Sequence, residues 1–130
     1  MIRHCRYVIA VQDLGRSAAY YRDVLGFEVL QIPDPGWRFF RRDDCVIMAG
    51  ECPGALAPAA LGDHSYFAYL EVDDAEALYA ALVERGAEIQ KALRLESWGM
   101  HEFGIRTIDG HRIMFGSVAS SSKLKPSADP

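Results

Sequence analysis

The chain carries the same order of apolar and polar positions twice. From Val8, the segment VIAVQDLGRSAAYYRDVLGFEVL begins with an apolar run typical of a strand and continues with apolar residues at helical spacing. From Ala68, the segment AYLEVDDAEALYAALVERGAEI repeats this order. Each apolar run ends in Val-x-Asp, at residues 11–13 and 72–74. The pattern therefore predicts an internal repeat whose unit begins with a strand and a helix.

Both predicted helices carry their own start and stop signals. Asp13 and Asp74 stand at the position where a side chain can accept hydrogen bonds from the free amides of a first helical turn. Gly26 and Gly86 stand where a helix can end in a left-handed conformation. The apolar positions of the two helices are Leu14, Ala18, Tyr21 and Leu25, and Ala75, Leu78 and Leu82.

The pattern after each helix predicts three further strands. FEVLQI and AEIQKAL follow the two glycines, and each is followed by a strand, a turn and a strand, in WRFFRRDDCVIMAG and HEFGIRTIDGHRIMFG. Asp-Gly in the second turn is a strong hairpin signal. We therefore expect an α+β fold in one domain, with modules at 1–52 and 65–118 and a Gly-, Ala- and Pro-containing linker at 53–64. Residues 119–130 are polar, and we expect a disordered tail there.

Composition and net charge limit further the classes of function that fit the chain. The chain has 130 residues, of which 50% are hydrophobic, and a net charge of −4, so nothing indicates a nucleic-acid partner. The first residues lack the apolar stretch of a signal peptide, and no apolar run is long enough to cross a membrane. Cys5, Cys45 and Cys52 form no CxxC pair. Reduced thiols and a cytoplasmic location are therefore expected.

In combination, VQDLGRSAAYYRDVLGFEVL, LEVDDAEALYAALVERGAEI and WGMHEFGIRTIDGHRIMFG resemble the vicinal oxygen chelate superfamily, which contains glyoxalases, bleomycin-resistance proteins and dioxygenases. The resemblance covers most of residues 6–117. It implies two βαβββ modules that form a cupped mixed sheet, with the helices outside and the site inside the cup.

The resemblance also locates the metal ligands of the family's enzymes, commonly His on the first strand of a module and Glu on its last. The residues at these positions are Arg6, Phe67, Met48 and Met114. Arg and Phe offer no lone pair at neutral pH, and a thioether is too soft for the oxygen-preferring metals of the family. We therefore expect no metal and no cofactor, and a binding protein is favoured over an enzyme.

The sequence gives little support for a metal site at other positions or for nucleophilic catalysis. A metal site rebuilt from His4, His64, His101 or His111 stays open as an alternative, although no HxH or HExxH spacing occurs. Cys45 alternates away from the cup, and no nucleophile with a base and an orienting group can be assembled. No catalytic residue is predicted.

Alternate residues of a strand face the same side of a sheet, which predicts the lining of the cup. The lining is aromatic and rich in Met, which suits a flat organic ligand, although each side chain could instead belong to the core. The predicted ligand-binding residues are Arg6, Val8, Trp37, Phe39, Met48, Phe67, Tyr69, Trp98, Arg112 and Met114.

Two functions are compatible with these observations. The chain is similar to the bleomycin-resistance branch, whose members bind a drug as dimers with sites at the subunit interface. This similarity favours a metal-free homodimer that binds an aromatic or heterocyclic small molecule, including an antibiotic, as a means of resistance. The alternative is a metal-dependent lyase, isomerase or dioxygenase with atypical ligands. The sequence names neither the ligand nor the residues that cross the dimer interface.

Overall fold

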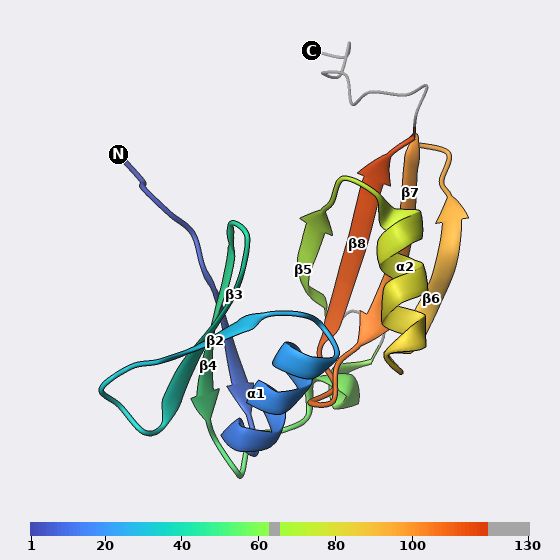
Figure 1. The fold of residues 1–130 in the computed structure, drawn as a ribbon. Helices are drawn as coiled ribbons and strands as arrows, with labels where there is room; N and C mark the ends of the chain where they lie inside the picture. Colours follow the sequence, from blue (N-terminus) through green and yellow to red (C-terminus); the bar gives the residue numbers. More distant parts are fainter. Residues whose placement is uncertain (63–65, 120–130) are drawn as a thin grey trace.

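The structure, a computed structural model, describes residues 1–62 and 66–119 and consists of two βαβββ modules (Figure 1). Module 1 contains β1 (Tyr7–Val11), α1 (Leu14–Asp23), β2 (Glu28–Gln31), β3 (Trp37–Arg42) and β4 (Cys45–Glu51). Module 2 contains β5 (Tyr66–Glu71), α2 (Ala75–Glu84), β6 (Glu88–Leu95), β7 (Met100–Arg106) and β8 (Arg112–Val118). The predicted α+β class and the repeated order of elements are confirmed.

Each module has its own four-stranded mixed sheet. The strand orders are β1-β4-β3-β2 and β5-β8-β7-β6. The first strand of each module pairs in parallel with the last, and the other neighbours pair antiparallel. The first strand of each module thus lies at the edge of its sheet, next to the closing strand on which the resemblance places a metal ligand.

The helix signals in the sequence are confirmed. Asp13 accepts a hydrogen bond from the amide of Arg16, and Asp74 accepts one from the amide of Ala77, both at 3.0 Å. Gly26 and Gly86 have φ values of 76° and 85°, the left-handed conformation that glycine adopts without a steric penalty. The equivalent caps explain why both helices span ten residues.

Each helix packs on one face of the sheet in its own module, and the core lies between them (Figure 1). In module 1, the ring of the fully buried Tyr21 stacks on Phe40 with centroids 4.5 Å apart. In module 2, Phe103 and Phe115 stack with centroids 5.1 Å apart. Because alternate strand residues supply these cores, the remaining residues of each strand point to the opposite face of the sheet.

A few specific contacts join the two modules. The Ser17 hydroxyl of α1 donates to the Asp109 carboxylate in the β7–β8 turn, with oxygen–oxygen distances of 2.8 and 2.9 Å. Near the edges of the two sheets, Tyr7 and Phe67 meet edge to face with centroids 5.8 Å apart. These contacts connect each module to the other by its helix side or its edge strand, and not by the face of the sheet that lies opposite its helix.

The connection between the modules contains a short 3₁₀ helix at Pro58–Leu61, within the predicted linker. His64 and the predicted tail residues 120–130 lie outside the described residues. Among the residues that are described, no helix combines the length and apolar character needed to span a membrane.

Candidate ligand-binding faces

The face of the module 2 sheet opposite α2, called face 2 here, carries a row of side chains set by strand register. Tyr69 of β5 pairs with Met114 of β8, which pairs with Gly104 of β7, which pairs with Lys91 of β6. Laterally paired residues point to the same side of a sheet. The register therefore brings Tyr69 and Met114, two of the predicted ligand-binding residues, side by side.

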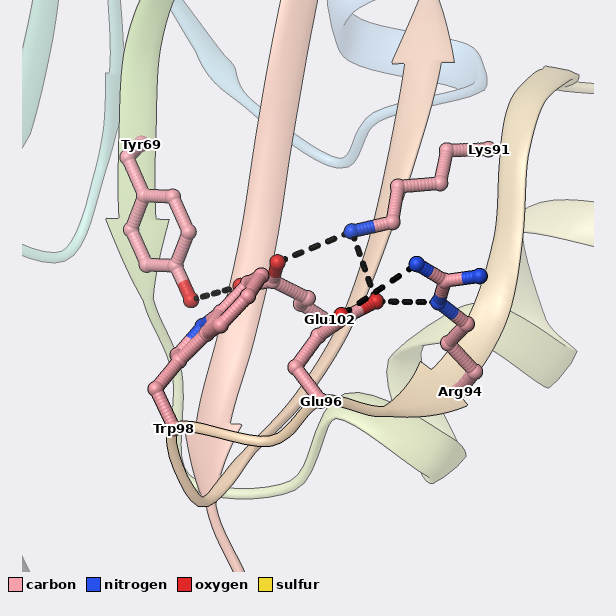
Figure 2. Close-up of polar contacts among 6 residues, drawn as sticks. All are labelled: Tyr69, Lys91, Arg94, Glu96, Trp98 and Glu102. Carbon is pink, nitrogen blue, oxygen red and sulfur yellow. Dashed lines mark hydrogen bonds and ion pairs between the residues drawn. The ribbon is translucent and has the colours of Figure 1, made fainter.

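Glu102 is the centre of a hydrogen-bond network on face 2 (Figure 2). Its carboxylate accepts from the Tyr69 hydroxyl at 2.7 Å, from Lys91 Nζ at 2.9 Å and from Trp98 Nε1 at 3.4 Å. Glu102 is only 3% exposed, whereas Tyr69 and Trp98 are 44% and 58% exposed. A buried carboxylate thus holds two aromatic side chains that remain open to solvent.

A second carboxylate balances the charges of the network. Glu96 accepts from Lys91 at 3.0 Å and from Arg94, so that two cations face two carboxylates (Figure 2). Because donors and acceptors of opposite charge are matched, the network satisfies its own hydrogen-bonding capacity and presents no net charge to a ligand.

The network shifts the pKa values of its members in directions that preserve it. Burial alone would raise the pKa of Glu102, but hydrogen bonds from Lys91 and Tyr69 outweigh burial and lower that pKa. Burial, followed by the hydrogen bond to Glu102, raises the pKa of Tyr69. Tyr69 therefore stays protonated and donates its hydrogen bond throughout the neutral range.

The corresponding face of module 1, opposite α1, is called face 1. Val8 of β1 pairs with Met48 of β4, and Met48 pairs with Phe39 of β3, which places three predicted residues in one row. The guanidinium of Arg6 lies over the Phe39 ring, with Cζ 5.6 Å from the ring centroid. Val8 is 64% exposed, so this row also remains open to solvent.

Two of the predicted ligand-binding residues lie in packed surroundings instead. Phe67 is partly buried against the core, between the rings of Tyr7 and His111. Arg112 is 4% exposed, and its guanidinium lies over the Tyr66 ring at 5.7 Å. The register of β5 shifts between Tyr66 and Ala68, so simple alternation does not hold at Phe67, whereas Arg112 keeps its regular pairing with Arg106 of β7.

The residues at the family's metal-ligand positions do not fit a divalent metal. Arg6, Met48, Phe67 and Met114 supply a cation, two thioethers and a phenyl ring. Within residues 1–62 and 66–119, no group of three or more His, Cys, Asp or Glu side chains is placed to hold a metal ion.

The histidines that the structure describes lie apart from one another. His4 is exposed, and His101 lies 3.8 Å from the carboxylate of Glu76 on the helix side of its sheet. His111 is buried, and burial lowers its pKa to about 4, so it is neutral at pH 7. His101 has a carboxylate neighbour, but none of these three rings lies in a group of three or more potential metal ligands among the described residues.

Sequence reasoning missed the charged members of the network, Lys91, Arg94, Glu96 and Glu102. Glu102 could have been found, because it stands two residues before Gly104 on β7 and shares its face. Lys91 and Arg94 could not be found by alternation, because the register of β6 shifts between them. Glu96 and Trp98 follow β6 in a turn, whose path the alternation of a strand does not describe.

A hollow of the molecule adjoins face 2 at Tyr69. A cleft of about 790 Å³ lies between the modules, where Tyr7 and Phe27 of module 1 face Leu78 and Ala81 of α2. Tyr69 of face 2 also lines this cleft, whereas Trp98 and Glu102 do not. Val8, Met48, Trp98 and Met114 lie outside the cleft, so a ligand on these parts of faces 1 and 2 would be covered from one side in a single chain.

A sequence model of the Glyoxalase/Bleomycin resistance protein/Dioxygenase superfamily matches residues 2–115 of the chain. None of the curated proteins matches it. Among solved structures, a glyoxalase/bleomycin resistance protein from Catenulispora acidiphila is 26% identical, with a TM-score of 0.68 over 88% of this chain and 97% of that one.

Two further solved structures are described as binding antibiotics. The bleomycin-binding protein from Streptomyces verticillus, solved with copper(II)-bleomycin, is 19% identical, with a TM-score of 0.69 over 93% of this chain and 98% of that one. TnmS3, an antibiotic binding protein from Streptomyces sp. CB03234, is 21% identical, with a TM-score of 0.66 over 92% and 99%. At these identities the likeness shows a shared fold.

Proposed function

The chain belongs to the Glyoxalase/Bleomycin resistance protein/Dioxygenase superfamily, and within that superfamily we propose that it is a metal-free protein that binds an aromatic or heterocyclic small molecule. The observation that carries this proposal is the network on face 2. Glu102 is buried and fully hydrogen-bonded, yet it holds Tyr69 and Trp98 in exposed positions. Aromatic side chains that are both fixed and exposed are suited to stacking on a ring of a ligand.

An antibiotic is the ligand class that the comparisons support. The bleomycin-binding protein and TnmS3 share the fold and are described as binding antibiotics. Sequestration by such a protein requires binding alone. The chemistry of faces 1 and 2 agrees with this, because neither face brings together a nucleophile, a base and an orienting group among the described residues.

We further propose that two copies of the chain complete each site. A ligand on face 1 or face 2 would contact one chain on one side only, and exposed apolar side chains such as Val8 and Trp98 would remain in water. If face 1 of one copy lies opposite face 2 of the other, the ligand is enclosed and both apolar surfaces are covered. A two-fold dimer of this kind holds two equivalent sites.

The residues placed at the lost metal positions would then serve as walls. Met114 packs beside Tyr69 and offers an adaptable apolar surface, and Arg6 is a charged residue that directly precedes β1. Arg6 would pair with an anionic or polar edge of the ligand. The free thiols Cys5, Cys45 and Cys52 fit a reducing compartment, and we place the protein in the cytoplasm.

The test is a fluorescence titration of the purified protein with a panel of aromatic antibiotics and aromatic carboxylic acids. Because Trp98 is exposed and hydrogen-bonded to Glu102, a stacked ligand should quench its emission. The proposal expects saturable quenching by at least one compound, and a Trp98→Phe variant should lose most of that signal. The absence of saturable binding across the whole panel would overturn the proposal.

A further inference from the structure

Two aromatic rings, the half-buried Trp37 and the exposed Tyr69, lie directly over glycines of the closing strands. A Cβ atom added to Gly50 of β4 would lie 2.8 Å from the Cη2 and Cζ2 atoms of Trp37. A Cβ atom added to Gly116 of β8 would lie 2.7 Å from Cζ of Tyr69 and would overlap its hydroxyl oxygen. Both rings thus occupy space in which the side chain of any other residue would begin.

These glycines are not required by the backbone. The glycines with positive φ are Gly26, Gly62, Gly86, Gly99 and Gly110, and neither Gly50 nor Gly116 is among them. An L-residue could adopt the extended backbone at both positions. What the two glycines contribute is therefore the absence of a side chain, which lets an aromatic ring lie against the sheet.

The arrangement occurs at the same place in both modules but is built differently. Gly50 and Gly116 each stand two residues after the methionine of the closing strand, Met48 or Met114. In module 1 the ring comes from Trp37 on β3, the direct cross-strand partner of Gly50. In module 2 it comes from Tyr69 on β5, at the opposite side of the closing strand.

The ring on face 2 is also fixed in this position. The hydroxyl of Tyr69 donates to Glu102 across β8, so the ring cannot swing away from the sheet without breaking that hydrogen bond (Figure 2). In the network around Glu102, Lys91 and Arg94 are matched by Glu96 and Glu102. The carboxylate of Glu71 also acts on Tyr69, so the ring face offered to a ligand has one further carboxylate near it.

We propose that Gly50 and Gly116 determine ligand specificity by turning faces 1 and 2 into flat aromatic platforms for a planar, fused-ring compound. This inference rests on the proposed binding function and names its ligand class. A planar compound contacts the Trp37 or Tyr69 ring over its whole area, and in a dimer it is held between the platform of one copy and that of the other. A twisted compound of equal size touches each platform with part of its surface only.

Two probe compounds separate the effect of ligand planarity on binding from the effect of chemical composition. 9-Oxofluorene-2-carboxylate is planar, and benzophenone-3-carboxylate has the same rings and the same placement of carbonyl and carboxylate but lacks the bond that flattens them. Binding of each is measured by tryptophan quenching to wild type, Gly50→Ala, Gly116→Ala and the control Gly54→Ala. Gly54 suits this control because an added Cβ there has no neighbour within 4 Å and its φ is not positive.

The wild type and Gly54→Ala are expected to bind the planar probe about tenfold more tightly than the twisted probe, the size of a well-formed aromatic stack. Gly50→Ala and Gly116→Ala are expected to lose most of that preference, because they bind the planar probe less tightly. Should either alanine variant fail to fold by circular dichroism, Trp37→Leu and Tyr69→Leu keep the glycines and remove the rings, and they should show the same loss.

The outcomes separate this inference from the proposed function. The platform would be overturned, with aromatic binding intact, if the wild type bound both probes with equal affinity. It would also be overturned if the alanine variants of the two glycines and the leucine variants of the two rings kept the preference for the planar probe. Failure of both probes in a protein that binds another compound of the aromatic panel would likewise overturn only the platform. Failure of the probes and of the entire panel would overturn both.

Discussion

At the residue scale, Glu102 combines burial with three hydrogen bonds from Tyr69, Lys91 and Trp98. Glu102→Ala should lower the free energy of unfolding by roughly 2 kcal/mol, in the range for hydrogen bonds to a charged group. It should also allow the Tyr69 and Trp98 rings to move and should weaken binding of the ligand. Urea denaturation measures the stability change, and quenching of Trp98 measures the binding change.

The matched control for Glu102→Ala is Glu88→Ala. Glu88 is a carboxylate on β6 whose side chain is 63% exposed and lies 3.7 Å from Arg106. An exposed ion pair of this kind contributes about 0–1 kcal/mol. Equal losses of stability in the two variants would show that the Glu102 network is not a distinct stabilising unit.

Protonation of His111 should make the free energy of unfolding depend on pH. Burial lowers its pKa from 6.5 to about 4, so the unfolded chain binds a proton at this residue before the folded chain does. The associated stability is present above pH 6.5 and is lost as the pH falls toward 4. His111→Phe keeps an aromatic ring beside Phe67 and removes the titrating group. Between pH 6.5 and 4, the unfolding free energy of this variant should therefore fall by less than that of the wild type, with a difference on the order of 2 kcal/mol.

Thermal or urea unfolding at several pH values between 7 and 4 checks this prediction. His101→Phe is the control, because His101 is partly exposed and lies beside Glu76. A wild type and a His111→Phe variant with parallel pH profiles would show that His111 is protonated equally in the folded and unfolded chains.

At the scale of elements, the two N-caps offer a symmetric test. Asp13→Ala and Asp74→Ala each remove one hydrogen bond to an amide of the first helical turn, and each should cost about 1 kcal/mol of stability. Asp73→Ala is the control, because Asp73 is an exposed carboxylate adjacent to Asp74 that is not the cap. Losses of similar size in Asp73→Ala and Asp74→Ala would attribute the effect to charge and not to capping.

Element order was predictable because its signals are local. Each helix has an Asp at its start and a Gly at its end, and each strand run is bounded by turns, so the sequence indicates both modules without knowledge of their packing. The rows of faces 1 and 2 followed from alternation where the strands are regular. Val8 with Met48 and Tyr69 with Met114 are the clearest examples.

Alternation failed where strand register is irregular. The shift in β5 between Tyr66 and Ala68 is associated with the packed position of Phe67. The shifts in β6 place Lys91 and Arg94 in one network although they are three residues apart. Such bulges depend on cross-strand pairing and are not encoded in a short local pattern. The rings over Gly50 and Gly116 depend on side-chain direction, which residue order alone does not give.

At the scale of the whole molecule, two open faces in one chain predict a homodimer. Sedimentation at micromolar concentration should give a mass of twice the 14.5 kDa chain. The physical reason is that exposed Val8, Tyr69 and Trp98 lie on faces that a second copy can cover. A single monomeric species at that concentration would contradict the pairing of face 1 with face 2.

The proposed function is metal-free binding of an aromatic ligand on faces 1 and 2, which carry Met48 and Met114 from the family's metal-ligand positions. The most direct measurement is a calorimetric titration of a ligand from the aromatic panel into protein kept in excess EDTA. We expect one ligand per chain and the same affinity with EDTA as with added divalent metal, because Arg6, Met48, Phe67 and Met114 offer no suitable ligand set. Binding that is lost in EDTA and restored by a divalent metal would contradict it.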